Sequence, residues 1–459
     1  MAPHASDSRH EIPTANGTST DGSSTNANGT DVAPVIIVGA GPVGLLLALR
    51  LAMNQIRTVV LEKEPWLNPL PRAIGYHGPV HNVFEEIGLY DQIAAEGMAS
   101  GGYAWRKLPT DNSMGKPGPD GKFTPGHYSI QLAQCRLAEI FLENATKTGF
   151  TKVLWEHEVT GLSQDEHQVS VKVATASGGE KVIRGQYLAA CDGSRSTVRK
   201  LLGIRLSGHS WPERFLATDV LRVAPVVPDF SVHFTVDETF WGVVTPLEHV
   251  EAGKQGLWRY SLAVPEKPND DINSAPLTDE QVLEPEYVDS LLLRQIDGPR
   301  PSSHVVVRKS LYKMHQLLAS TMHRGRCFLA GDSAHINNPI GGLGLCTGLL
   351  DGDALARTLQ IAFSTSPSDP NLEPLFNRYS TERRWVFQNV IHPFSSANKI
   401  RLHGAKPDDV VREDWYFTAL ARGDPKELQD IHRPLYAQWR TDMRKFWPAG
   451  TDVKEPKAP

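Results

Sequence analysis

Residues 34–44 read Pro-Val-Ile-Ile-Val-Gly-Ala-Gly-Pro-Val-Gly, a short apolar run of strand type that ends in a glycine-rich turn. An apolar stretch with helical character follows over residues 43–54. A second strand-type run, Thr-Val-Val-Leu at residues 58–61, closes on Glu62. This order predicts a βαβ unit, in which two parallel strands are joined by a right-handed crossover through the helix.

The glycines of this turn and the acid that follows it predict a dinucleotide site. We expect Gly39 to permit the tight turn, Gly41 to let the backbone approach a pyrophosphate, and Gly44 to let the helix pack closely on the strand. The helix N-terminus offers free N–H groups to phosphate. Glu62 stands about twenty residues on, where a carboxylate can accept hydrogen bonds from a ribose diol. The pattern does not distinguish FAD from NAD.

Composition and charge exclude several classes of protein. The 459 residues carry 47 Lys and Arg against 52 Asp and Glu, a formal charge of −5. With no basic block, we expect a small-molecule substrate and no nucleic-acid partner. Four scattered cysteines without a CxxC pair fit a reducing compartment, so the cytoplasm is the expected location. We find neither a secretory leader, nor an apolar run long enough to span a membrane, nor a metal-binding cluster.

The pattern changes along the chain and predicts an α/β protein. A polar tail is expected to be disordered, because it has too little apolar surface to offset the entropy of ordering. We predict a Rossmann-like nucleotide-binding domain interrupted by a β-rich substrate domain, whose strands alternate in polarity, and a helical C-terminal region. The predicted bounds are 1–31 for the tail; 32–105, 128–205 and 305–400 for the nucleotide domain; 106–127 and 206–304 for the β-rich domain; and 401–459 for the C-terminal helical extension.

Two further motifs follow strand-type runs. Residues 191–199 read Cys-Asp-Gly-Ser-Arg-Ser-Thr-Val-Arg, and residues 331–345 read Gly-Asp-Ser-Ala-His-Ile-Asn-Asn-Pro-Ile-Gly-Gly-Leu-Gly-Leu. Together with the first motif they resemble the single-component, class A FAD-dependent monooxygenases of the para-hydroxybenzoate hydroxylase type, including fungal aromatic and secondary-metabolite hydroxylases. The resemblance covers roughly residues 34–395. It is specific for cofactor and reaction class and says nothing about the substrate.

The resemblance implies the cofactor and the reaction. NAD(P)H would reduce FAD, O2 would add to the flavin C4a carbon, and the resulting hydroperoxide would transfer one oxygen atom to a phenolic, polyketide or other secondary-metabolite substrate. NADPH rather than NADH is a family expectation. The protein would bind and orient the reactants and exclude water, as a monomer or a homodimer.

The resemblance also assigns cofactor-binding residues. Asp332 would accept a hydrogen bond from the FAD ribitol, and Asp192 belongs to the Asp-Gly motif. Arg72 would sit over the flavin near the nicotinamide, beside Ala73. Either Gln134 or Arg136 would contact the phosphate-ribityl region, and Gln134 fits the register better. The loop before the next helix would bring its backbone to the flavin pyrimidine edge through Pro339, Gly342, Gly344 and Leu345.

A general base near the flavin would help a phenol to react as phenolate. The candidates are His77 and, with less claim, Tyr76, His233 and Tyr260. A single His or Tyr at such a position is more often a side chain of the protein core than a catalytic base. Arg72 is the other catalytic candidate.

Two other readings stay open. A flavin-dependent reductase or halogenase could share the fold, although no Trp-x-Trp-x-Ile-Pro segment is present. An FAD-binding sensor without turnover is the third reading, and an intact Arg72 segment disfavours it. Aromatic residues in the β-rich insert suggest a flat ligand, although aromatics at strand spacing are more often core.

Overall fold

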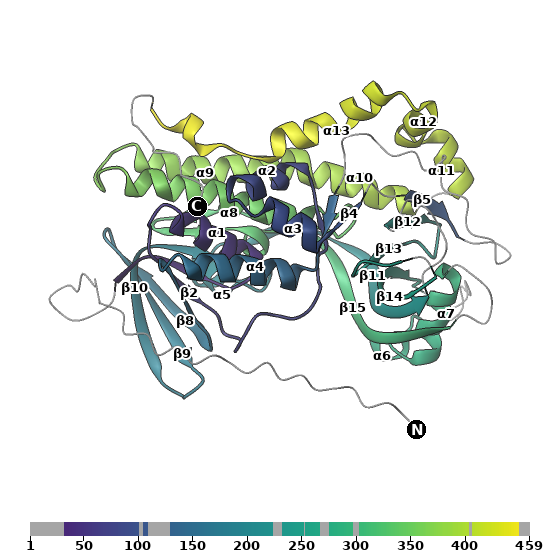
Figure 1. Ribbon diagram of the computed structural model, residues 1–459, viewed down its shortest axis with the longest axis horizontal. Helices are drawn as coiled ribbons and strands as arrows, with labels where there is room; N and C mark the ends of the chain where they lie inside the picture. Colours follow the sequence, from purple (N-terminus) through teal and green to yellow (C-terminus); the bar gives the residue numbers. More distant parts are fainter. Residues whose placement is uncertain are drawn as a thin grey trace.

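The computed structural model describes residues 32–100, 104–108, 129–223, 232–251, 253–266, 275–296, 303–403 and 406–448. The predicted disordered tail and residues 109–127 of the predicted β-rich domain lie outside them. Two sheets stand side by side in Figure 1, with helices along their upper side and the C-terminal helices over the right-hand sheet.

The first sheet carries the βαβ unit and has the strand order β16-β17-β10-β1-β2-β7. Its strands from β17 to β7 are parallel, and β16 is antiparallel to β17. A hairpin of β8 and β9 continues from β10. The bounds are β1 Val32–Val38, β2 Thr58–Leu61, β7 Thr151–Leu154, β8 His157–Gln164, β9 Val169–Thr175, β10 Glu180–Ala190, β16 His323–Arg324 and β17 Cys327–Leu329.

Helices bury the parallel sheet. α1 (Pro42–Ala52) and α8 (Leu343–Phe363) are buried over almost their whole lengths. This explains why α1 is apolar nearly all round instead of amphipathic. α1 packs against both α4 (Gln134–Lys147) and α8. The remaining helices of this part are α2 Gly78–Glu86, α3 Tyr90–Glu96, α5 Thr197–Leu201 and α9 Leu372–Val386.

The second sheet has the order β18-β15-β11-β14-β13-β12-β5 and is antiparallel except for the β12–β5 pair. α6 (Asp279–Val282) and α7 (Pro285–Gln295) cover one of its faces. A second, largely aromatic core cluster packs on this sheet and includes Phe215 of β11 together with Trp241 and Phe417. The strand bounds are β5 Ala104–Lys107, β11 Leu206–Val223, β12 His233–Val236, β13 Gly242–Pro246, β14 Gln255–Val264, β15 His304–Ala319 and β18 His335–Ile336.

The predicted domain boundary at 304/305 differs from the structure. β15 pairs with β11 from Arg222↔His304 to Leu206↔Ala319, so the β-rich sheet extends well past residue 304. β5 also belongs to this sheet, so residues 104–105 lie with the β-rich part and not, as the sequence predicts, with the nucleotide domain. β15 runs from the β-rich sheet toward the nucleotide-binding part, and no change in amino-acid composition marks the point where one part ends and the other begins.

The remaining elements are a small sheet and a series of helices toward the C-terminus. A small sheet, β3-β6-β4, consists of Gly75–Tyr76, Ser129–Gln131 and Met98–Ser100. A π-helical turn, η4 (Phe387–Ile391), leads from α9 into α10 (His392–Leu402). The C-terminal region is helical, as predicted, with α11 Pro407–Glu413, α12 Trp415–Arg422, α13 Pro425–Trp439 and η5 Met443–Phe446. No described helix is long and apolar enough to cross a membrane.

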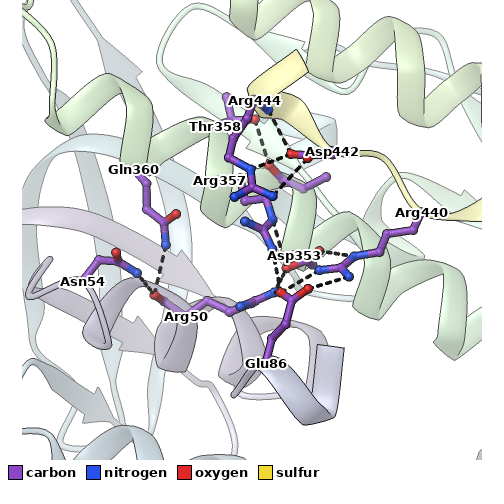
Figure 2. A network of polar contacts seen from close by, with 11 residues as sticks. Arg50, Asn54, Glu86, Asp353, Arg357, Thr358, Gln360, Arg440, Asp442 and Arg444 are labelled. Carbon is purple, nitrogen blue, oxygen red and sulfur yellow. Dashed lines mark hydrogen bonds and ion pairs between the residues drawn. The ribbon is translucent and has the colours of Figure 1, made fainter. Parts of the chain in front are cut away.

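A charged cluster ties the C-terminal region to the nucleotide-binding part (Figure 2). Asp353 of α8 is wholly buried and pairs with Arg50 of α1. Arg440 follows α13, and it donates to Asp353 at 3.0 Å and contacts Glu86 of α2 at 2.7 Å. Asp353 and Glu86 share the arginines Arg50 and Arg440. These ion pairs hold together α1, α2, α8 and the segment after α13.

Candidate functional site

The first glycine-rich turn lies between β1 and α1, and its geometry fits a close ligand. Gly39 has φ +105°, and a Cβ there would lie 2.4 Å from the Cys191 carbonyl oxygen. A Cβ on Gly44 would lie 2.2 Å from the Gly39 oxygen, whereas a Cβ on Gly41 would meet nothing within 4 Å. Close packing against the protein backbone therefore requires glycine at positions 39 and 44. Gly41 faces open space, where a phosphate can approach the N-terminus of α1.

Glu62 closes β2 beside this turn. Its Oε2 accepts a hydrogen bond from the Ala40 N–H at 2.8 Å, and its Oε1 accepts one from the Glu64 N–H at 3.1 Å. Each carboxylate oxygen has a second lone pair. The carboxylate is therefore fixed against the glycine turn and can still accept from a diol.

The second motif places a buried carboxylate next to Gly39. Asp192 Oδ2 accepts from the Val198 N–H at 3.1 Å, while Oδ1 is buried with no hydrogen-bond partner among the described residues. Burial raises the pKa of Asp192, against hydrogen bonds from Ser196 and the Val198 backbone that lower it. An orphaned buried acceptor at this place fits a ligand that donates a hydrogen bond, as a cofactor hydroxyl would.

The third motif joins the second through Arg199. Its guanidinium donates to the carbonyl oxygens of Ser194 and Ser333, both at 2.9 Å. The Asp332 side chain is exposed, unlike its buried neighbours Gly331 and Ser333. Desolvation raises the pKa of Asp332, and the charges of His335 and Arg72 oppose the rise. Asp332 and Arg72 thus lie within electrostatic reach of each other.

The loop after the third motif turns sharply into α8. Gly341 and Gly342 have φ values of +96° and +67°, a region that favours glycine. α8 begins at Leu343, so Gly344 and Leu345 lie in its first turn, and Pro339 is exposed at the loop. The Nε2 atom of His77 lies 3.2 Å from the Gly341 oxygen. Nε2 must carry a proton to make that bond, so a neutral His77 keeps only Nδ1 as a base.

The Arg72 segment meets the start of α4. The Ala73 N–H donates to Gln134 Oε1 at 3.3 Å, and the Gln134 N–H donates to the Ala73 oxygen at 3.0 Å. The structure therefore brings Ala73 and Gln134 together. Arg136 points elsewhere on α4 and binds Glu96 at 2.6 Å and Glu139 at 2.8 Å. Its guanidinium is occupied by carboxylates, so the structure favours Gln134 over Arg136.

The other base candidates lie in the protein core. Tyr76 and Tyr260 are wholly buried, and burial raises the pKa of Tyr76 well above its usual value. Tyr260 belongs to the apolar cluster beneath α6 and α7. His233 is buried on β12. Their positions match the reading of these three residues as core side chains.

Two charged groups at the site escaped the sequence reading. Asp351 of α8 is wholly buried, and it accepts from the Gly331 N–H at 3.0 Å, from His335 at 2.6 Å and from Arg383 at 2.6 Å. Burial would raise the pKa of Asp351, but His335 and Arg383 outweigh it and lower the pKa. The sequence does carry a signal for it, because Asp351 and Asp353 are two acids within a largely apolar helix. The second group is Arg259 on β14, which donates to the Arg72 carbonyl oxygen. Nothing in the residues around Arg259 in the sequence indicates this contact.

Comparison with known proteins agrees with this geometry. The family model described as "FAD binding domain" matches residues 32–393. The chain is 33% identical over 395 residues to para-nitrophenol 4-monooxygenase of Pseudomonas sp. (strain WBC-3), covering 83% of this chain and 90% of that protein. It is 30% identical over 386 residues to 6-hydroxy-3-succinoylpyridine 3-monooxygenase of Pseudomonas putida (strain DSM 28022 / S16), covering 83% and 91%.

Solved structures show the same fold. The crystal structure of p-nitrophenol 4-monooxygenase from Pseudomonas putida DLL-E4 superposes with a TM-score of 0.76 at 29% identity, covering 90% of this chain and 99% of that one. Aklavinone-11 hydroxylase in complex with FAD and aklavinone superposes with a TM-score of 0.67 at 21% identity, covering 87% of this chain and 73% of that one. At that identity the second likeness establishes the fold alone.

Proposed function

This chain belongs to the class A family of FAD-dependent aromatic monooxygenases, and from that membership we propose that it oxygenates a small hydroxyarene at a substituted ring carbon para to the hydroxyl group. The predictions of an enzyme, of FAD as cofactor and of an aromatic monooxygenase reaction with NAD(P)H and O2 are confirmed. The substrate and the position of oxygenation are the proposal.

The names of two relatives carry the proposal. Carbon 4 of para-nitrophenol bears the nitro group and stands opposite the hydroxyl. Carbon 3 of 6-hydroxy-3-succinoylpyridine bears the succinoyl group and again stands opposite the hydroxyl. Both relatives are named for oxygenation at the substituted carbon. A match that covers nine-tenths of each relative's length supports carrying this pattern over to the present chain.

Oxygenation at such a carbon has a defined outcome. One oxygen atom of O2 forms a bond to the ring carbon, and the other leaves as water with the two electrons of NAD(P)H. An electron-withdrawing substituent X then departs with the bonding pair, and the hydroxyl oxygen becomes the second carbonyl of a para-quinone. The balance is HO–Ar–X + O2 + NAD(P)H + H⁺ giving O=Ar=O + HX + H2O + NAD(P)⁺.

FAD, when bound, supplies the transfer of electrons from NAD(P)H to O2 and of oxygen to the ring. We assign its pyrophosphate to Gly41 and the N-terminus of α1, and its ribose to Glu62. Asp192 Oδ1 and Asp332 would accept from its hydroxyl groups. The 339–345 loop would hold the flavin edge, and Arg72, held near Asp332, would meet the incoming nicotinamide.

Turnover of para-nitrophenol tests the proposal. The FAD-loaded protein, with NADPH under air and ascorbate to reduce the quinone, should consume one NADPH for each nitrite released and place one atom of labelled O2 in the product. NADPH oxidation that yields only hydrogen peroxide would contradict oxygenation of this substrate. Retention of the nitro group with oxygen at a neighbouring carbon would keep the oxygenase and overturn the proposed position.

We also propose a cytoplasmic location and a monomeric or homodimeric state. The four cysteines, all free in the structure, support a reducing compartment. Sedimentation of the purified protein would decide the oligomeric state.

A further inference from the structure

A lysine lies buried between the second sheet and α10. The Lys399 side chain is wholly buried, and its Nζ donates to Glu213 Oε1 at 2.5 Å. The same Nζ lies 2.5 Å from His403 Nε2, 4.2 Å from the ring centre of Trp211 and 5.2 Å from that of Trp241. A buried cation between two indole rings is costly to desolvate, so its presence calls for an explanation.

Irregular backbone on both sides builds this cluster. The pairing of β11 with β15 shifts register between Ser210 and Arg214, and the extra residues of β11 include Trp211 and Glu213. Bulges of this kind re-aim side chains and are common beside active sites. On the other side, the π-helical turn 387–391 directly precedes α10, and such turns are also frequent at functional sites.

Four polar atoms around Lys399 are buried with no hydrogen-bond partner among the described residues. They are Glu213 Oε2, Trp211 Nε1, Ser395 Oγ and Ser396 Oγ. Ser395 is wholly buried. The two serines precede Lys399 by four and three positions on α10, so they share its side of the helix. Buried polar groups nearly always have partners, so these orphans indicate a missing polar ligand; Trp211 Nε1 and the two serine hydroxyls can donate to it, whereas Glu213 Oε2 can only accept.

The cluster borders the loop that we assign to the flavin. A Cβ on Gly341 would lie 3.2 Å from Asn398 Nδ2, so α10 touches that loop one residue before Lys399. Ile340 of the loop and Trp241 belong to one apolar cluster. The Lys399 cluster therefore lies beside the loop against which the proposed ring would sit.

We propose that Lys399, Trp211, Ser395 and Ser396 bind the hydroxyl oxygen of the aromatic substrate as its anion. This inference rests on the proposed function, because oxygenation para to the hydroxyl points that oxygen away from the flavin. Lys399 has three N–H donors, and the indole N–H and the two serine hydroxyls can donate as well. The hydroxyl proton is released toward solvent by way of His403, whose side chain is 24% exposed. The anionic ring is the more reactive one toward an electrophilic oxygen.

The neighbouring titratable groups suit this role. They are Glu213 on β11 and His403 after α10, with His209 and His392 facing each other further along at 5.6 Å. Burial and the Lys399 charge lower the pKa of His403, and burial and His209 lower that of His392. Burial lowers the pKa of Lys399 against the opposing pull of Glu213. These effects keep His403 neutral beside the Lys399 ammonium, and the Glu213 carboxylate balances the Lys399 charge in the empty site.

Binding of para-nitrophenol to the FAD-loaded protein tests the inference, because the anion and the neutral phenol absorb at different wavelengths. Wild type should bind the anion preferentially, which lowers the apparent pKa of the bound phenol relative to free phenol. Ser395→Ala removes only a hydroxyl oxygen that lacks a partner among the described residues, whereas Trp211→Phe also shrinks the ring that packs on Lys399 and His209. A purely structural role of Ser395 predicts no loss of melting temperature or of anion affinity in Ser395→Ala, whereas our inference predicts weaker anion binding by about ten-fold in both variants.

Lys399→Met should abolish the preference for the anion. Because it strands Glu213, the double variant Lys399→Met/Glu213→Gln serves if the single variant does not fold. Ser163→Ala, at an exposed position on β8, is the matched control and should bind like wild type. Para-nitroanisole keeps the nitro group and has no ionisable hydroxyl, so its binding should be the same in all variants.

The outcomes separate the two proposals. If wild type neither binds nor turns over para-nitrophenol, the proposed function fails. If wild type does both and the folded, FAD-loaded variants bind the anion as tightly, the assignment of Lys399 is overturned. Loss of para-nitroanisole binding in the Trp211 or Lys399 variants would place the nitro group at this site and would also overturn it.

Discussion

Arg259 of β14 forms a two-pronged ion pair with Asp219 of β11, with Nε–Oδ1 and Nη2–Oδ2 distances of 2.8 and 3.0 Å. Its Nη1 donates to the Arg72 carbonyl oxygen at 3.0 Å and also to that of Pro71. One side chain of the substrate sheet therefore fixes the backbone of the Arg72 segment. Arg259 is a positioning residue, since it acts on the proposed nicotinamide contact through that backbone.

Arg259→Lys should slow flavin reduction by NADPH while leaving FAD occupancy close to that of wild type. Lysine keeps the charge but cannot hold Asp219 and both carbonyls at once. Arg259→Met should also destabilise the fold by about 3 kcal/mol, because it strands the buried Asp219. Stopped-flow reduction and urea unfolding would measure the two effects, and an unchanged reduction rate in the lysine variant would refute the positioning role.

Gly41→Ala and Gly44→Ala form a matched pair that separates ligand space from protein packing. Gly41→Ala should leave the free energy of unfolding of the FAD-free protein unchanged, since its Cβ meets nothing within 4 Å. It should weaken FAD binding at least about ten-fold, or 1.4 kcal/mol. Gly44→Ala should destabilise the fold by at least about 2 kcal/mol, because its Cβ would overlap the Gly39 oxygen. Flavin fluorescence titration and chemical unfolding check both, and FAD binding by Gly41→Ala at wild-type strength would remove the pyrophosphate from this turn.

His77 is expected to shape the flavin loop through Gly341 and not to act as the base. His77→Ala should change the visible spectrum of bound FAD and lower kcat. His77→Gln should restore part of both, because its amide nitrogen can still donate to the Gly341 oxygen. The pH profile of kcat/KM should keep its shape in both variants. Disappearance of one limb of the profile in both would show that His77 is a base after all.

Glu86 should contribute to acid stability. Burial raises its pKa, but hydrogen bonds from Arg440 and Arg50 outweigh this and lower the pKa from 4.5 to about 2. A depressed folded-state pKa gives stability that is complete above about pH 4.5 and is lost as the pH falls toward 2. The carboxylate is 37% exposed, so solvent screening reduces the contribution to about 1–2 kcal/mol.

Glu86→Gln should therefore lower stability at pH 7 by that amount and flatten the loss between pH 4.5 and 2. Urea unfolding at several pH values measures this. Glu85→Gln, on the exposed neighbour, is the control and should follow the wild-type curve. Parallel curves for wild type and Glu86→Gln would show that the cluster in Figure 2 does not depend on this charge.

The nucleotide-binding part could be predicted from the sequence because its requirements are local. Gly39 needs a positive φ and Gly44 needs the absence of a Cβ, and these demands act within one turn of chain. The βαβ periodicity and the Asp192 and Asp332 motifs are equally local, so the family and the cofactor followed from residue order. The substrate-domain boundary could not be predicted, since β15 continues a sheet whose partner strand lies about a hundred residues earlier.

By itself, the sequence determined the cofactor, the reaction class and the order of the elements. Only the tertiary structure decided which distant side chains meet. Lys399 finds Glu213 across 186 residues and Arg259 finds Arg72 across 187. Both contacts depend on how sheets, bulges and helices pack, and this packing cannot be predicted from the spacing of residues near either partner in the sequence. The physical reason is that backbone conformation depends on near neighbours in the chain, whereas a contact between distant side chains, such as the Lys399–Glu213 ion pair, forms only when the whole fold brings the partners together and buries them.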